Sequence, residues 1–393
     1  MFLSSYISNR ISKYKIIFFK RLFYFFPVDK YKIVFNNFNG KGFGDNPRYI
    51  AEEIFKQDLP YKLFWICNKT AEVPNWINRI SMFSIRGLYT LATSRVIINN
   101  VKNGLPYFKK KSQYYIQTWH GSLIMKYLEK EVEDKLSRTY VNASKADSKL
   151  IDCFLVASND DERIIKSNFW YDHEILRCGC PRSDVFFKKS VEYINQIKEK
   201  LEIPLKNKVV MYAPTFRDDF SVNGYKIDTN RILNALKIRF GNNWSLIIRL
   251  HPNVTVQDSV FHFNENVINV CNYPDAQDLS LIADIMITDY SSIMLDAFLQ
   301  GKPVFLYTSD YEEYIKNRPM HSIYKKLPCN RCATNDELIQ TILNFDSIIY
   351  QANLDKFLNI TFHSYDDGLA SKRVVERIND VINSGYQSPY ISY

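Results

Sequence analysis

Polar side chains that could do chemistry follow several apolar, strand-like runs of this sequence. His120 comes after the run that begins at Tyr114, and it stands beside Gly121. A histidine at a strand end can act as a base near neutral pH, because its free pKa is about 6.5. A histidine that is only hydrogen-bonded to a backbone carbonyl at a turn would give the same pattern. Loop-borne polar groups are more often functional than core ones, and the sequence leaves both interpretations open.

A second group of polar residues lies in the carboxyl-terminal half. Thr288, Asp289, Ser291 and Ser292 follow a buried strand, and Ser291 or Ser292 begins a predicted helix that runs to Gln300. Hydroxyls and free backbone amides at a helix start are what a phosphate needs. The alternative is that Asp289 or Ser291 is only an N-cap, which would look identical locally.

Two further strand ends favour the phosphate interpretation. Arg249 and His251 end one strand of the same predicted sheet, and Thr215 and Arg217 end another. Together they bring two guanidinium groups, a hydroxyl and a second histidine to the same edge. Such donors can neutralise a pyrophosphate as it leaves, so a base-like site and an anion site suit transfer from a nucleotide diphosphate to a hydroxyl.

The elements that must position these residues alternate between strand and helix along the chain. The predicted strands are 32–36, 62–67, 80–84, 95–100, 114–119, 153–158, 174–179, 209–213, 245–250, 267–271, 285–288 and 303–307. The predicted helices are 47–57, 160–169, 190–207, 228–239, 276–282, 292–300 and 367–383. This alternation is typical of parallel sheets covered by helices on both faces.

The length of 393 residues and 46% hydrophobic content favour two domains. We expect an α/β protein with an arm at 1–30, a Rossmann-like domain at 31–205, and a second one at 206–393 that includes the last helix. Two doubly wound domains would leave a ligand cleft between the carboxyl ends of their strands.

The amino-terminal arm predicts an amphipathic helix. Its apolar and aromatic face comprises Leu3, Ile7, Ile11, Tyr14, Phe18, Leu22 and Phe25. Seven lysines and arginines in residues 1–32, against one acid, account for +6 of the net charge of +9. The run is too short to span a bilayer and no cleavage site follows it, which favours a helix at an anionic membrane surface. The alternative is a helix packed on the protein's own core.

The rest of the chain is near neutral, so no nucleic-acid groove is indicated.

The seven cysteines indicate a reducing cytosol, because an odd number within or beside apolar runs is typical of buried thiols. Cys329 and Cys332 form a lone CxxC, which is a weak zinc signal beside ordinary loop thiols. We therefore predict neither a metal nor another cofactor.

Several ordered motifs resemble the CDP-glycerol glycerophosphotransferase family, whose enzymes prime or extend teichoic acids and related capsule polymers. They are Asp45–Tyr49, Gln117–Gly121, Pro181–Asp184, Tyr212–Arg217, Arg249–Pro252, Thr288–Ser292 and Gly301–Val304. The resemblance implies a GT-B arrangement, with the acceptor on the amino-terminal half and the nucleotide on the carboxyl-terminal half. It implies a peripheral enzyme on the cytoplasmic face of the membrane, a CDP-glycerol or CDP-ribitol donor, and a lipid-linked or polymeric glycan acceptor.

The same resemblance assigns roles to individual residues. His120 would take the proton from the acceptor hydroxyl, and His251 would lie near the donor phosphates. The donor pocket would be lined by Thr215, Arg217, Arg249, Thr288, Asp289, Ser291, Ser292 and Asp296. Asn46, Lys126 and Arg182 would lie on the acceptor side. The hydroxyl would attack the distal phosphorus and expel CMP.

Three departures and two alternatives accompany this resemblance. Residues 122–126 add a residue and lose a proline of the family pattern, and the usual glycine after Arg318 is missing beside His321. The chain also lacks the extra amino-terminal portion of long polymerising members, which favours single addition.

The alternative enzyme is a GT-B glycosyltransferase that uses a nucleotide sugar for capsule or lipopolysaccharide synthesis. The other alternative is a non-catalytic partner of a glycan synthase, and the full polar set argues against it.

Overall fold

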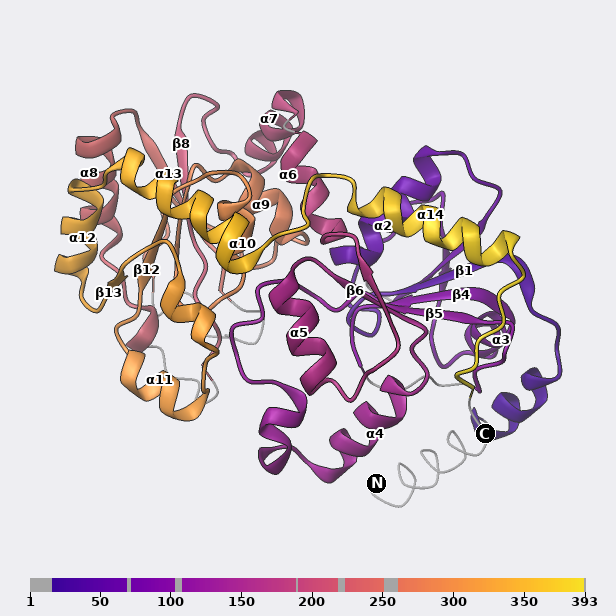
Figure 1. Ribbon diagram of the computed structural model, residues 1–393. Coiled ribbons are helices and arrows are strands. Elements are labelled where there is room, and N and C mark those ends of the chain that lie inside the picture. Colours follow the sequence, from indigo (N-terminus) through magenta and orange to yellow (C-terminus); the bar gives the residue numbers. More distant parts are fainter. Residues whose placement is uncertain are drawn as a thin grey trace, which may run out of the picture.

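The computed structural model describes residues 16–68, 72–102, 108–188, 190–217, 223–250 and 261–391. These residues form two parallel sheets covered by helices, each sheet in its own half of the molecule (Figure 1). All paired strands within the two sheets run parallel. The prediction of two doubly wound α/β domains is therefore confirmed.

The first domain contains a seven-stranded sheet in the order β3-β2-β1-β4-β5-β6-β7 within the described residues. Its strands are β1 (Asp29–Asn36), β2 (Lys62–Ile66), β3 (Asn78–Ile80), β4 (Ser94–Asn99), β5 (Tyr114–Gln117), β6 (Cys153–Val156) and β7 (Glu174–Arg177). Its helices are α2 (Asp45–Lys56), α3 (Ile85–Thr93), η1 (Glu129–Lys135), α4 (Arg138–Ser148), α5 (Asn159–Asn168) and η2 (Pro181–Asp184). The central strands are buried on both faces, as expected for a parallel sheet between helices.

The second domain contains a six-stranded sheet in the order β10-β9-β8-β11-β12-β13 within the described residues. Its strands are β8 (Lys208–Tyr212), β9 (Trp244–Ile248), β10 (Val267–Asn269), β11 (Ile285–Thr288), β12 (Val304–Tyr307) and β13 (Arg331–Cys332). Its helices are η3 (Asn223–Tyr225), α8 (Thr229–Phe240), α9 (Ala276–Ile282), α10 (Met294–Phe298), α11 (Tyr311–Asn317), η4 (Ser322–Lys326), α12 (Asn335–Leu343), α13 (Ser347–Lys356) and the π-helix η5 (Phe357–Phe362).

The chain passes from the first domain to the second earlier than the predicted boundary at 205. Helices α6 (Val185–Lys188) and α7 (Val191–Lys200) follow η2 directly. Phe186, Ile197 and Ile203 pack in one apolar cluster with Val209 of β8. The charged composition of this segment marked it as a connection, but it could not show which sheet its buried residues would cover.

The last helix, α14 (Ala370–Asn383), returns to the first domain, as Figure 1 shows. Val374, Val375 and Ile378 are fully buried in the same cluster as Ile33 and Phe35 of β1. The prediction that this helix belongs to the second domain is therefore corrected. The apolar face of this helix predicts that the helix is buried, but it does not indicate which of the two similar sheets the helix covers.

The described part of the arm has one packed face and one exposed face. Residues 16–24 are helical, and Phe23 is buried with its ring 5.4 Å from that of Tyr89. Nζ of Lys110 donates hydrogen bonds to the carbonyl oxygens of Phe23 and Phe26 at 3.0 and 2.6 Å. The outward side chains that belong to the predicted apolar face are Phe18, Leu22 and Phe25. The predicted positions Leu3, Ile7, Ile11 and Tyr14 lie outside the described residues.

The described arm and core carry neither a disulfide nor a spanning segment. All seven cysteines are free thiols, and all but Cys329 are buried. Within the described residues, each helix is too short or too polar to cross a bilayer. The same residues bring no three histidine, cysteine or acidic side chains together as a set of metal ligands.

Candidate active site

His120 lies in the tight turn that follows β5. Trp119 and Gly121 on either side of it have positive φ angles of 52° and 152°. A Cβ atom at Gly121 would lie 3.1 Å from Nη2 of Arg182 and 3.6 Å from Oγ of Ser292 in the second domain. Glycine is therefore needed here both for the backbone conformation and because the two domains approach each other closely at this point.

The imidazole of His120 has one nitrogen bonded and the other available. Nδ1 lies 2.9 Å from the carbonyl oxygen of Asn100, so Nδ1 carries the hydrogen of the neutral ring. Nε2 then presents a lone pair, and it has no hydrogen-bond partner among the described residues. Burial lowers the pKa of His120, which keeps the ring neutral at pH 7. The sequence left two alternatives for His120, a base and a histidine that is hydrogen-bonded to a backbone carbonyl at a turn. The two roles are compatible, because they use different ring nitrogens.

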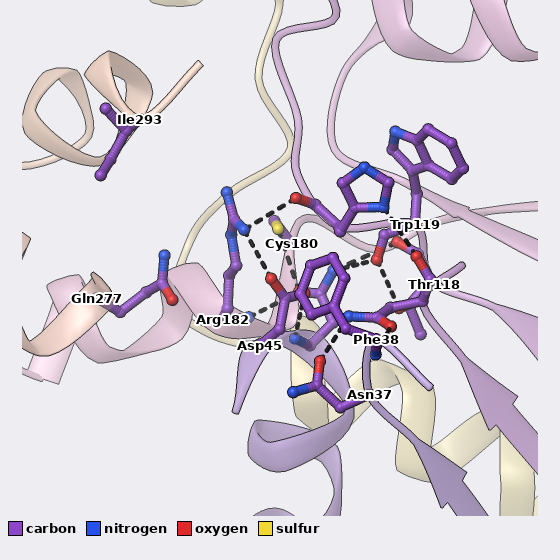
Figure 2. Close-up of polar contacts among 12 residues, drawn as sticks. Asn37, Phe38, Asp45, Thr118, Trp119, Cys180, Arg182, Gln277 and Ile293 are labelled. Atoms are coloured by element: carbon purple, nitrogen blue, oxygen red, sulfur yellow. Dashed lines mark hydrogen bonds and ion pairs between the residues drawn. The ribbon is translucent and has the colours of Figure 1, made fainter. Parts of the chain in front are cut away.

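Aromatic rings fix the plane of the His120 imidazole. The ring centroid lies 4.1 Å from that of Trp119 and 5.4 Å from that of Phe38. Figure 2 labels both of these aromatic residues. Because the ring is held by packing and by one hydrogen bond, Nε2 has a fixed direction before any substrate binds.

Asn46 and Arg182, both predicted on the acceptor side, hold the His120 turn through hydrogen bonds to its backbone. Nδ2 of Asn46 donates to the carbonyl oxygens of Thr118 and Trp119 at 3.3 and 3.2 Å. Its Oδ1 accepts the backbone N–H of Arg182 at 3.0 Å. Asn46 is buried and saturated with hydrogen bonds, so it supports the site without facing the cleft.

Arg182 connects this support to the cleft. Its Nη1 lies 2.8 Å from Oδ2 of Asp45 and donates to the carbonyl oxygen of His120 at 3.0 Å. Its Nε is buried and has no hydrogen-bond partner among the described residues. Figure 2 shows its guanidinium pointing toward the side where Gln277 and Ile293 of the second domain lie. A buried donor without a partner is costly, and an oxygen acceptor placed beside this nitrogen would remove that cost.

Lys126 brings the two domains together on the other side of His120. It pairs in an antiparallel bridge with Met320, and its Nζ lies 5.6 Å from the centroid of the Tyr314 ring. The N–H of Tyr127 donates to Pro319 O at 3.0 Å, and the N–H of His321 donates to Met125 O at 2.7 Å. His321 thus has a structural position at the junction of the domains.

A cavity of about 200 Å³ joins the two predicted halves of the site. From the first domain it is lined by residues 119–126 and Leu128, and from the second by Tyr290, Ser291 and Ser292. The predicted base and the predicted anion-binding serines therefore face one space. This juxtaposition joins His120 to Ser291 and Ser292, which are far away in the chain, so local sequence patterns could not locate it.

Thr288, Asp289 and Arg217 hold the strand ends of the second sheet together. The hydroxyl of Thr288 donates to Ala213 O at 2.7 Å, and Asp289 accepts the N–H of Thr215 at 2.8 Å. Arg217 forms ion pairs with Asp289 at 2.9 Å and with Asp310 at 2.6 Å. Nε and Nη2 of Arg217 thus contact carboxylates, and Nη1 donates to the carbonyl oxygen of Thr215.

Thr215 and Arg249 retain capacity for a ligand. Oγ1 of Thr215 is buried without a hydrogen-bond partner among the described residues. Arg249 donates from Nη1 to Tyr273 O at 2.7 Å and forms no ion pair within the described part of the chain. Burial lowers the pKa of Arg249, so a nearby anion would stabilise its charge. His251, two residues further on, lies outside the described residues.

The serine turn differs from the predicted helix start. Helix α10 spans only Met294–Phe298, and its N-cap is Ile293 without a side-chain hydrogen bond. Neither Asp289 nor Ser291 therefore caps the helix, and Ser291 and Ser292 lie in the turn before it. Asp296 is buried and accepts hydrogen bonds from Gln277 at 3.1 Å and Ser280 at 3.2 Å. Burial raises its pKa to about 6, and the charge of Arg182 opposes that rise.

Two cleft residues were absent from the predicted set. Asp275, the N-cap of α9, forms an ion pair with Arg48 of α2 and accepts a hydrogen bond from Tyr49 at 3.4 Å. Asp310, which follows β12, holds Arg217. Arg48 and Tyr49 lie within the motif Asp45–Tyr49, and Asp310 follows a predicted strand. Nothing in the sequence indicates that Asp275 contacts Arg48 and Tyr49, or that Asp310 contacts Arg217.

Comparison with known proteins shows the family to which this chain belongs. A profile described as CDP-glycerol:poly(glycerophosphate) glycerophosphotransferase matches residues 18–380. The teichoic acid poly(glycerol phosphate) polymerase of Staphylococcus epidermidis is 30% identical, with 88% of this chain and 50% of that protein covered. The polymerase of the same name from Bacillus spizizenii is 29% identical, with 96% of this chain and 98% of that protein covered.

A solved structure of the wall teichoic acid polymerase TagF has a TM-score of 0.82 at 28% identity and covers 97% of this chain and 98% of that chain. This chain thus spans half the length of one curated relative and nearly the whole length of another. Because a protein named a polymerase is matched over 98% of its length, chain length does not favour single addition. With the profile matched over residues 18–380 and the same fold throughout, the chain belongs to the CDP-glycerol:poly(glycerophosphate) glycerophosphotransferase family.

Proposed function

We propose that this chain transfers glycerol phosphate, or a related polyol phosphate, from a CDP-activated donor to a hydroxyl of a surface glycan. The observation that carries the proposal is the shared cavity between His120 and the Ser291–Ser292 turn. Family membership supports the donor, and a histidine variant of the polymerase TagF has been solved after a soak with CDPG.

The proposed reaction is a displacement at the distal phosphorus of the donor. Nε2 of His120 takes the proton of the acceptor hydroxyl while its oxygen forms a bond to that phosphorus. The bond from the phosphorus to the bridging oxygen breaks, and CMP leaves with that oxygen. Arg249, Thr215 and the two serines are proposed to hold the diphosphate, so that positioning and charge stabilisation supply most of the acceleration.

A donor screen tests this proposal. The protein is incubated with CDP-glycerol, CDP-ribitol or a panel of nucleotide sugars, together with a glycan acceptor, and release of the nucleotide is measured. We expect CMP from a CDP-polyol, with acceptor-dependent incorporation of the polyol phosphate. Release of nucleotide from a sugar donor alone would assign the chain to the glycosyltransferases instead. Binding of CDP-glycerol without turnover would support the non-catalytic alternative.

We further propose that the protein binds the cytoplasmic face of the membrane through residues 16–26. Phe18 and Phe25 are 61% and 82% exposed, whereas Phe23 on the opposite side of the same helix is buried. Lys20 and Arg21 lie between the outward rings in the sequence. An arm that is anchored to the fold by one face and presents aromatic and basic groups on the other suits an anionic lipid surface.

The variant Phe18→Ser/Leu22→Ser/Phe25→Ser is expected to lose at least about tenfold in affinity for anionic liposomes, because a buried large apolar side chain contributes about 1.5–3 kcal/mol. Turnover of a short soluble acceptor should be unchanged. Co-sedimentation at two salt concentrations is the measurement. This variant keeps Phe23 and its contact with Lys110, whereas deletion of the arm would expose the core.

The matched control is Val191→Ser/Ile238→Ser/Ile348→Ser, which removes exposed apolar side chains elsewhere. It should sediment with liposomes like the wild type. If the arm variant also sediments fully, the membrane contact lies on another surface.

A further inference from the structure

A second cavity lies in the second domain, apart from the candidate active site. Its volume is about 920 Å³, within the range of ligand pockets. We call it the outer cavity. It shares no lining residue with the cavity at His120. Its walls come from the segment 325–330, from α12, α13 and η5, and from the start of β12. Figure 1 shows α12 and β13 at the end of the second domain away from the first.

The floor of the outer cavity follows from the short edge strand of the second sheet. β13 has only two residues and pairs with Leu306 and Tyr307. The first half of β12, Val304 and Phe305, therefore lacks a neighbouring strand on that side and lines the cavity instead. Phe345, Tyr350 and Phe357 complete an apolar floor.

The rim of the outer cavity carries an excess of positive charge. Lys325, Lys326 and Lys356 line it, against one carboxylate, Asp346. Asp346 already accepts the backbone N–H groups of Ile348 and Ile349, each at 2.9 Å. The three lysines form no ion pair with other described residues. Their charges are thus available to an anion from outside.

Side-chain amides line the outer cavity together with these charges. Four of them line the cavity: Asn330, Gln340, Asn344 and Asn353. Within the described residues their side chains make no hydrogen bond with the protein. Amides both donate and accept hydrogen bonds, which suits hydroxyl groups, whereas lysines suit phosphates. The combination matches a flexible ligand in which phosphates alternate with polyols.

One short helix connects the outer cavity to the candidate active site. η4 follows His321, whose N–H donates to Met125 O beside the cavity at His120. The hydroxyl of Tyr324 lies 3.4 Å from Asp289 O, next to the serine turn. Lys325 and Lys326, at the end of η4, line the outer cavity. A chain that leaves the active site along η4 would meet these lysines.

We propose that the outer cavity binds a segment of the anionic polyol-phosphate polymer away from its reacting end. The identity of this ligand rests on the proposed function. A second contact keeps the acceptor near the enzyme between additions, because it raises the effective concentration of the chain end. The attraction is between charges at an exposed rim, so it weakens as salt rises.

The test compares Lys325→Glu/Lys326→Glu/Lys356→Glu with the wild-type full-length protein. The probe is a purified poly(glycerol phosphate) oligomer, and calorimetry measures its affinity, with inorganic phosphate as a second probe. We expect oligomer affinity to fall at least tenfold. The KM for long acceptors should rise by a similar factor, while kcat and the KM for a single-unit acceptor stay within twofold.

The matched control Lys206→Glu/Lys237→Glu/Lys372→Glu changes the net charge equally at exposed lysines outside the cavity. An equal loss of affinity in the control would overturn the proposal, because general charge attraction would then explain the binding. Unchanged oligomer affinity in the cavity variant would also overturn it, as would wild-type binding of inorganic phosphate as tight as that of the oligomer.

The variant Asn344→Leu/Asn353→Leu provides a second test that keeps every charge, and it should weaken oligomer binding several-fold. Retained oligomer affinity would show that the amides do not recognise hydroxyls. Oligomer binding and donor turnover are measured separately. Absence of CDP-glycerol turnover with intact oligomer binding would contradict the proposed function but not the site.

Discussion

Replacing His120 with alanine should lower kcat/KM for transfer by about 10²- to 10⁴-fold, the usual cost of removing a general base. Affinity for a CDP ligand should remain close to that of the wild type, because the ring belongs to the first domain. The loss of rate is expected because the alanine variant lacks the basic nitrogen Nε2. The hydrogen bond from Nδ1 to Asn100 O fixes the direction of Nε2. His120 lines the cavity that it shares with the serines. Initial-rate measurements with the natural acceptor are the readout.

The variant His120→Asn separates the role of the basic nitrogen from the role of the hydrogen bond to Asn100 O. An asparagine can still donate to Asn100 O but has no basic nitrogen, so its activity should be as low as that of the alanine variant. Recovery of more than half of the wild-type rate in either variant would contradict the assignment.

The pH profile gives an independent readout of the same base. Because burial lowers the pKa of His120, the neutral form persists to a pH below 6.5. Log kcat/KM should therefore rise with unit slope at acidic pH and level off below pH 6.5, and this limb should vanish in the His120→Asn variant.

The triple variant Arg249→Ala/Ser291→Ala/Ser292→Ala should lose at least about a hundredfold in affinity for CDP-glycerol. Hydrogen bonds to charged groups contribute about 1.5–3 kcal/mol each, and this variant removes three donors around one proposed diphosphate. The guanidinium of Arg249 has no carboxylate partner among the described residues, so its loss should cost binding more than folding. Calorimetry with CDP-glycerol is the measurement.

The variant Arg239→Ala/Ser347→Ala/Ser384→Ala removes the same types of side chain from exposed positions and serves as the control. Its donor affinity should equal that of the wild type. If the cleft variant also binds CDP-glycerol normally, the diphosphate lies elsewhere in the cleft.

Much of the fold could be predicted because parallel strands are continuous apolar runs. β11 coincides with the predicted 285–288, and α9 coincides with 276–282. β3 shares only Ile80 with the predicted strand 80–84, and Ile80 is the one buried residue of its three. β13 was missed, because two residues at a sheet edge carry no periodic signal. Helices α3, α4, α11, α12 and α13 were also missed.

The candidate site was predictable as a set of strand ends but not as a set of contacts. A sequence can indicate that His120 and Ser291 end strands of different sheets, and the cleft of the fold then brings them together. It cannot show that Arg217 is held by Asp310, because the partner lies 93 positions away and follows a different strand. Nor can it separate Asn46, whose side chain joins the His120 turn to the backbone N–H of Arg182, from a residue that contacts the acceptor.

The return of α14 to the first sheet has a consequence for protein synthesis. Ordinarily the amino-terminal domain of a chain folds first as it leaves the ribosome. Here the cluster around Ile33 and Phe35 stays open until Val374, Val375 and Ile378 have been made. The second sheet is complete at Cys332, so the second domain should acquire its structure before the first. A ribosome that stalls before residue 370 would therefore release a chain with an exposed apolar sheet, a substrate for chaperones and proteases.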